Sequence, residues 1–126
     1  MVPVPFSLLG SLIEFDSRDE TPAMGTVFTS PHIQLSDILV DPNSDTMLRD
    51  LAILVSHRGV VFFKNQKLSV RQLREVGTRL GELSGKPATS TLHKHPISES
   101  TPELGADISV ISSEGYVEAS VCCYRC

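Results

Sequence analysis

The chain contains the stretch His57-Arg58-Gly59-Val60-Val61-Phe62-Phe63, followed eighteen positions later by Gly81-Glu82-Leu83, and these residues give the strongest indication of its fold. The run Gly59 to Phe63 is too short for a helix and is rich in β-branched and aromatic residues, so it predicts a strand covered on both faces. A strand of this kind belongs inside a sheet and needs neighbouring strands. The sequence around it therefore has to supply helices and further strands.

Two amphipathic helices are predicted on either side of this strand. The first begins at Ser44 or Asp45 and ends at Gly59, with apolar residues at three- and four-residue steps: Met47, Leu48, Leu51, Leu54 and Val55. The second begins with the capping box Ser69-x-x-Gln72. Its apolar stripe, which we expect to pack against the strand, consists of Leu73, Val76, Leu80 and Leu83.

Shorter elements are predicted elsewhere in the chain. Residues 1–24 are rich in Pro, Ser, Thr and Asp, and we expect a flexible arm there. Short strands are expected at 25–28 and 33–35, and the alternating segment 107–111 predicts a half-buried strand.

The composition is that of one small globular domain. The chain has 126 residues, of which 40% are hydrophobic and 21% charged, and a net charge of −4. Its basic residues are scattered, which excludes the footprint of a nucleic-acid partner. No apolar run approaches the roughly 20 residues of a membrane span, and no cysteine framework runs through the body of the chain. We therefore expect a cytoplasmic protein whose partners are small molecules or other proteins.

The order of segments resembles a known family. The strand and turn from Val60 to Gln66 read Val-Val-Phe-x-x-x-Gln and precede a helix that closes on Gly81-Glu82-Leu83. This order resembles the N-terminal part of the taurine/sulfonate (TauD/TfdA) family of iron(II)- and 2-oxoglutarate-dependent dioxygenases, over residues 25–115. The resemblance implies an α+β fold, the outer helices and first strands of a double-stranded β-helix or jelly roll. The Cys-rich tail at 116–126 diverges from the family.

The iron ligands of that family cannot be identified in this sequence. Non-haem iron oxygenases hold Fe(II) with two histidines and one carboxylate, and in this family one His belongs to a His-x-Asp or His-x-Glu pair. None of the four histidines here is followed two residues later by an acid: His32, His57, His93 and His95. We therefore assign no catalytic or metal-binding residue and expect the family's Fe(II) and 2-oxoglutarate not to bind this chain tightly.

The motif His93-Lys94-His95-Pro96 has three interpretations. The two histidines of an extended segment could share a metal, or they could belong to a solvated loop. The motif also resembles the His-x-His-Pro of taurine-type members, which implies that His95 contacts an anionic substrate. His93 and Lys86 are further candidate contacts, because cationic or N–H groups bind anionic oxygens well. This sequence departs from the family by nine extra residues, 84–92, before the motif.

Two functions remain open. The first is a fragment of a dioxygenase that acts on sulfonate-type, taurine-like substrates, inactive alone because it lacks the iron triad. The second is a small non-catalytic α/β binding or regulatory module that associates with full-length dioxygenase subunits or with itself. The tail residues Cys122, Cys123 and Cys126 suit either translated non-coding sequence or a three-thiol metal or redox site.

Overall fold

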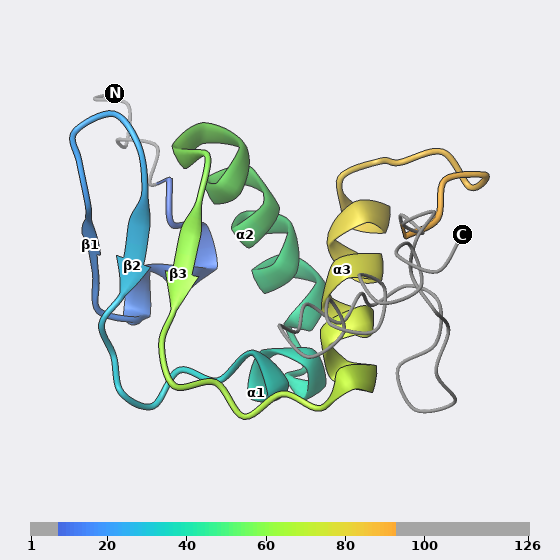
Figure 1. Cartoon of the computed structure of the whole chain (residues 1–126), viewed down its shortest axis with the longest axis horizontal. Coiled ribbons are helices and arrows are strands. Elements are labelled where there is room, and N and C mark those ends of the chain that lie inside the picture. Colours follow the sequence, from blue (N-terminus) through green and yellow to red (C-terminus); the bar gives the residue numbers. More distant parts are fainter. Residues whose placement is uncertain (1–7, 93–126) are drawn as a thin grey trace, which may run out of the picture. The chain divides into compact units, whose positions relative to one another are not determined.

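A computed structural model of the chain describes residues 8–92, and its helices and strands all belong to the first of two compact units, residues 1–91 and 92–126 (Figure 1). The elements form an α+β arrangement. Their order along the chain is the 3₁₀ helix η1 (Gly10–Glu14), β1 (Ser17–Asp19), β2 (Thr26–Phe28), α1 (Leu35–Val40), α2 (Ser44–Arg58), β3 (Val61–Phe63) and α3 (Val70–Leu83).

The three strands form one mixed sheet in the order β1-β2-β3. β1 pairs antiparallel with β2, and β2 pairs parallel with β3, which places Phe28 opposite Phe63. The rings of Phe28 and Phe63 stack with their centroids 4.9 Å apart. The strands predicted at 25–28 and 59–63 are confirmed. Within the described residues β3 lies at a sheet edge and Phe62 is 47% exposed, so the cover predicted for both of its faces is not supplied by residues 8–92.

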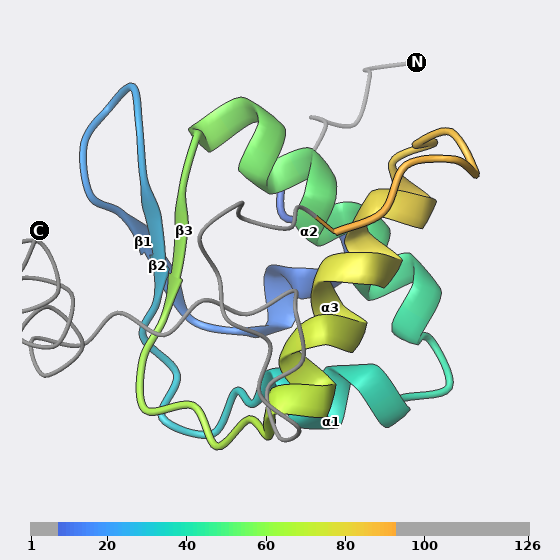
Figure 2. The same cartoon turned by 45° about the vertical axis from the view of Figure 1, so that its right-hand side comes forward.

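Helix α2 lies between the sheet and α3 (Figures 1 and 2). It runs from Ser44 to Arg58 and is followed by Gly59, as the sequence predicts. Its stripe of Met47, Leu48, Leu51 and Leu54 is buried in the core, which also takes in Phe28. Val55, predicted to belong to this stripe, is 37% exposed. The apolar spacing therefore identifies the buried face of α2 correctly but includes one residue, Val55, that is not buried.

Helix α3 has the predicted capping box. The amide of Gln72 donates to Ser69 Oγ (3.2 Å), and the amide of Ser69 donates to Gln72 Oε1 (2.9 Å). The expectation that α3 packs against β3 is wrong, since its partners are α2 and α1. Val76 is buried against them, whereas Leu73 is 52% exposed. An amphipathic stripe determines which face is buried but not which element covers it.

A long side chain fixes α3 to the other helices. Arg79 donates to the carbonyl oxygen of Leu39 at the end of α1 (3.1 Å) and to the carboxylate of Asp45 at the start of α2 (2.5 Å). From the sequence we expect Arg79 to belong to a solvated, ion-paired face of α3 that also holds Glu75 and Glu82, whereas its ion pair is with Asp45 of α2. Its guanidinium instead spans two helices because the carbonyls at the end of α1 have no partner within that helix.

The strand expected at 33–35 is not formed. The chain is extended at Gln34, but α1 begins at Leu35, and Ile33 is buried in the core. The amide of Leu35 donates to Gln66 Oε1 (2.8 Å), so a side chain takes the place of a neighbouring strand. The alternation that predicts a strand here comes from one buried residue in a loop.

Part of the expected flexible arm, the 3₁₀ helix η1, is attached to the core. Leu12 in η1 is fully buried in the core. The amide and the hydroxyl of Ser11 both donate to Asp50 Oδ2 of α2, at 2.7 and 2.6 Å. The polar composition of this segment does not predict the attachment, because only one buried leucine, Leu12, and one carboxylate, that of Asp50, form it.

Several predictions lie outside the described residues. They are the strand at 107–111, the histidines of the His-x-His-Pro motif and the Cys-rich tail at 116–126. Within residues 8–92, no helix combines the length and the apolar character needed to cross a membrane.

Candidate functional site

The candidate substrate contact Lys86 lies just beyond the end of α3. There the amide of Gly85 donates to the carbonyl of Glu82 and the amide of Lys86 to that of Gly81, both at 3.1 Å. These two bonds, with Gly85 at φ +82°, form a Schellman motif. The motif turns the chain sharply, so the position of Lys86 is set by the helix end itself.

The side chain of Lys86 is already engaged. Its Nζ donates to the carbonyl oxygen of Ser90 at 2.6 Å. Its methylene stem lies over Gly81, where an added Cβ would come 2.8 Å from Lys86 Cδ. A cation at this place complements the negative end of the helix dipole. In this structure Lys86 thus closes the turn from residue 86 to residue 90.

The other two candidate contacts, His93 and His95, lie outside the described residues. Of the histidines that the structure describes, His32 and His57 are both exposed. Across residues 8–92, no group of three or more His, Cys, Asp or Glu side chains could hold a metal ion. The described part of the chain therefore brings none of the candidate residues together and does not fit an iron centre.

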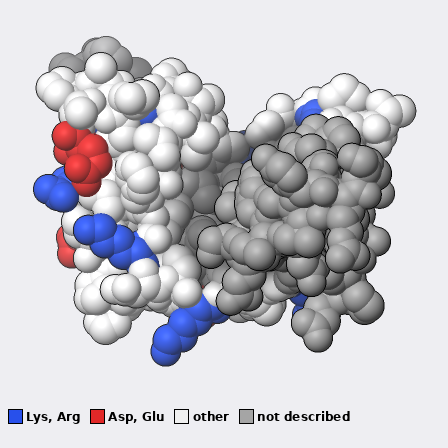
Figure 3. Space-filling model, viewed as in Figure 1, with Lys and Arg blue, Asp and Glu red and all other residues white. Residues whose placement is uncertain are grey.

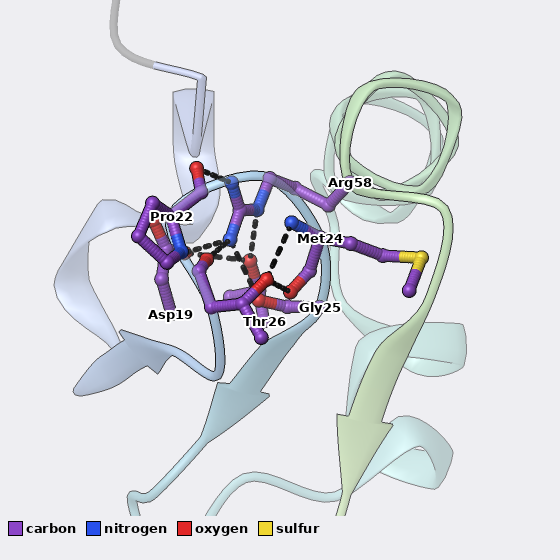
Figure 4. A network of polar contacts seen from close by, with 7 residues as sticks. Asp19, Pro22, Met24, Gly25, Thr26 and Arg58 are labelled. Carbon is purple, nitrogen blue, oxygen red and sulfur yellow. Dashed lines mark hydrogen bonds and ion pairs between the residues drawn. The ribbon is translucent and has the colours of Figure 1, made fainter.

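The most extensive polar network in the described residues surrounds Arg58, which the sequence analysis did not single out (Figure 4). The guanidinium is buried at the end of α2 and donates to backbone oxygens of the loop before β2 and to the hydroxyl of Thr26, the first residue of β2. Its bonds are Nε to Thr26 Oγ1 (3.1 Å), Nη1 to Pro22 O (3.1 Å), and Nη2 to Thr21 O (2.6 Å) and Gly25 O (2.8 Å). Asp19 completes the group as an ion pair with Nη2 at 3.3 Å.

This network is an attachment rather than a ligand site. Four N–H···O bonds and one ion pair use nearly all of the donors of a guanidinium, so little remains for a bound anion. Thr26 Oγ1 also donates to Asp19 Oδ1 (2.9 Å), which links β1 to the same group. The only sequence signal for it is an arginine placed directly before the glycine that ends the helix.

The glutamine of the Val-Val-Phe-x-x-x-Gln motif is likewise used to hold loops together. Gln66 Nε2 donates to Ile33 O (2.8 Å) and Lys64 O (3.0 Å) while its Oε1 accepts from the amide of Leu35. The motif position thus fixes the turn after β3 against the start of α1.

Comparison with known proteins identifies relatives that these contacts alone do not reveal. No family model matches the chain, and no solved structure matches it. It is 44% identical over 115 residues to the alpha-ketoglutarate-dependent dioxygenase btcD of Neocamarosporium betae, 45% over 107 residues to oryG of Aspergillus oryzae, and 43% over 99 residues to esdpJ of Penicillium shearii.

The matches cover 90%, 82% and 78% of this chain but only 33%, 31% and 26% of the relatives. The chain therefore spans about a third of the length of the curated relatives it matches. This coverage is consistent with the resemblance of the sequence to one part of a dioxygenase. Its homologues are alpha-ketoglutarate-dependent dioxygenases.

Proposed function

We propose that this chain is the N-terminal portion of an iron(II)- and 2-oxoglutarate-dependent dioxygenase of the TauD/TfdA type. The observation that carries the proposal is the 43–45% identity to three such dioxygenases over most of this chain and about a third of theirs. The family's segment order supports the finer assignment, since strand, motif glutamine and Gly-Glu-Leu helix end follow each other as β3, Gln66 and the last turn of α3.

The same proposal makes the described unit an outer part of a jelly roll. Its helices pack on one another and on a sheet of only three strands. In a double-stranded β-helix two larger sheets enclose the active site. The remaining strands belong, on this proposal, to the part of the dioxygenase that the chain does not match.

This chain alone is proposed to be inactive. Fe(II) held by two histidines and a carboxylate would supply the oxygen chemistry in the complete enzyme. The described residues do not fit such a site, and no histidine of the sequence begins a His-x-Asp or His-x-Glu pair. Activity therefore requires the iron ligands of the unmatched part.

The proposed substrate is an anionic, sulfonate-type molecule similar to taurine. The support is the motif from His93 to Pro96, whose second histidine, His95, corresponds to a sulfonate contact in the resembled family. A protonated imidazole gives a charge-assisted hydrogen bond to an anionic oxygen. His93 and Lys86 are the additional proposed contacts, and Lys86 would have to give up its bond to Ser90 O to serve as one.

A second candidate is a non-catalytic module that associates with full-length dioxygenase subunits. The observation in its favour is a core that closes within the described residues, where Leu12, Phe28, Leu48 and Leu54 are all at most 1% exposed. A unit with its own core can fold without the rest of an enzyme.

A chimera separates the two functions. This chain replaces the matching segment of the Aspergillus oryzae relative, and consumption of 2-oxoglutarate with Fe(II) is measured for the chimera, the chain alone and the relative lacking the segment. The proposal expects turnover by the chimera only. A well-folded chimera without turnover favours the non-catalytic module.

The substrate is tested in the same chimera. With taurine and a set of other sulfonates and carboxylates as probes, His95→Ala should raise KM for sulfonates by about tenfold or more and leave KM for 2-oxoglutarate unchanged. Lys94→Ala is the matched control in the same motif. Equal KM values for sulfonates in the two variants contradict the role of His95.

A further inference from the structure

The two outer edges of the described sheet differ in chemistry. The β1 edge is Ser17-Arg18-Asp19, and its charged side chains form ion pairs, Arg18 with Glu20 (3.1 Å) and Asp19 with Arg58 (3.3 Å). Figure 3 shows acidic and basic side chains side by side at this margin. The β3 edge is Val61-Phe62-Phe63, with no charge and no proline. Natural proteins protect exposed edges with charges, prolines or bulges, so only the β1 edge is built to face water.

The backbone of β3 directs pairing groups toward that unprotected side. The carbonyl of Val60 accepts a hydrogen bond from the amide of Thr26 (3.1 Å), so Val60 faces β2. Because peptide groups alternate in direction along a strand, Phe62 also faces β2, whereas Val61 and Phe63 direct their N–H and C=O groups outward. No described residue bonds to those outward groups outside the ladder with β2.

The side chains on one face of the sheet agree with this interpretation. Val61 and Phe63 pack with the core on the α2 side. Phe62 points to the opposite face, in register with Val27, and is 47% exposed although Val27 is 1% exposed. A half-exposed phenylalanine beside an open strand edge loses solvent-exposed apolar area when a further strand is added.

We infer that the outer edge of β3, with Phe62, is a seam: in the complete dioxygenase it pairs with a β-strand from the part of the protein that this chain does not match. The inference rests on the proposed function and names the surface where the two parts join. Its occupant follows from length, since about two thirds of each relative has no counterpart here. Parallel pairs such as β2 and β3 also occur mainly within sheets that are covered by further structure.

Amide hydrogen exchange measured residue by residue tests the seam. In the chain alone the amides of Val61 and Phe63 should exchange quickly, while those of Phe62 and Thr26, which pair within the sheet, should be protected. In the chimera with the Aspergillus oryzae relative, Val61 and Phe63 should slow by about a hundredfold or more, as for buried sheet amides.

The outcomes separate this inference from the proposed function. If the chimera turns over 2-oxoglutarate but the amides of Val61 and Phe63 still exchange quickly, the seam is overturned and the proposed function stands. If these amides exchange slowly but there is no turnover, the seam stands and the proposed function fails. Slow exchange of the Val61 and Phe63 amides in the chain alone also overturns the seam. If the protection grows with protein concentration, the occupant is a second copy of the chain; if it does not, the edge is already covered within the chain. Should the chimera fail to fold, the chain is mixed with the relative lacking its segment, and unchanged exchange at both amides overturns the seam.

A pair of variants tests the side-chain part of the seam. Phe62→Lys introduces the residue that most often guards exposed edges and should weaken binding of the unmatched polypeptide by about tenfold or more, because an aromatic side chain at the centre of an interface carries much of its affinity. Ile13→Lys is the control, a similar change at a residue on η1 that is 64% exposed. Equal binding by both variants counts against the seam.

Discussion

Gln34 and Gln66 each form hydrogen bonds to main-chain groups of the two residues that flank the other glutamine. Gln34 Nε2 donates to Asn65 O (3.1 Å) and its Oε1 accepts from the amide of Lys67 (2.9 Å), so it spans Gln66 on both sides. Gln66 in turn bonds Ile33 O and the amide of Leu35, at 2.8 Å each, and spans Gln34. Four hydrogen bonds thus hold the loop between β2 and α1 against the loop between β3 and α3.

The reciprocal glutamine pair should be worth measurable stability. Gln66→Ala leaves the partly buried amide of Leu35 and the carbonyl of Ile33 without partners, at a cost of about 1–3 kcal/mol in the free energy of unfolding. In a double-mutant cycle with Gln34→Ala, the combined loss should be smaller than the sum by about 0.5 kcal/mol or more, since either change frees both loops. Urea denaturation measures all three values, and strict additivity would show that the two side chains act independently.

The buried guanidinium of Arg58 should be the costliest polar group to remove. Arg58→Met keeps much of the apolar stem but leaves the carbonyl of Thr21 and the hydroxyl of Thr26 without the donor that Arg58 supplies. We expect a loss of about 2–4 kcal/mol in the free energy of unfolding.

The matched control for Arg58 is Arg18→Met. The side chain of Arg18 is 62% exposed and pairs only with Glu20, so its removal should cost less than about 0.5 kcal/mol. Thermal and urea unfolding of both variants give the comparison, and similar losses would mean that the network around Arg58 contributes little.

Two glycines near the end of α3 should respond in opposite directions. Gly85 has φ +82° and open space around its Cα, so Gly85→Ala carries only the conformational penalty of a left-handed residue, about 1 kcal/mol of destabilisation. Gly81 lies inside the helix, where alanine is favoured by about 1 kcal/mol. Its new methyl group displaces only the flexible stem of Lys86, so Gly81→Ala should be neutral or stabilising in urea unfolding. An equal loss in the two variants would contradict the Schellman geometry.

The attachment of η1 can be tested by proteolysis. Asp50→Ala removes the acceptor of both Ser11 bonds, and we expect faster cleavage between residues 8 and 16 and a loss of about 1–2 kcal/mol. Gly10→Ala should act in the same way, because its Cβ would overlap the Asp50 carboxylate and its φ is +51°. Asp37→Ala, an exposed acid on α1, is the control. Cleavage that is unchanged by Asp50→Ala would mean that Leu12 alone holds η1.

The elements with local signals were predictable from sequence. The capping box of Ser69 and Gln72 and the glycine after Arg58 fix helix ends within a few residues, and the β-branched run before Phe63 fixes β3. Long-range choices were not predictable. The packing of α3 on α2 instead of β3 and the burial of Leu12 depend on contacts between separate elements, which periodicity does not register. The side-chain partners Thr26 of Arg58 and Leu39 of Arg79 lie 32 and 40 positions away.

The candidate site was predictable only in part. The resemblance indicated a dioxygenase, and the comparisons bear out homology to alpha-ketoglutarate-dependent dioxygenases. The roles of His93 and His95 remain predictions, since both residues lie outside residues 8–92. For Lys86 the sequence could not foresee the Schellman turn, in which the ammonium group already has a carbonyl partner.

Whether this chain is part of a dioxygenase is decided by 2-oxoglutarate turnover in the chimera in which it replaces the matching segment of the Aspergillus oryzae relative. If the chain is the corresponding portion of a dioxygenase, the chimera consumes 2-oxoglutarate in the presence of Fe(II), while the chain alone and the relative without its segment do not. A folded, iron-loaded chimera that consumes none would contradict the account.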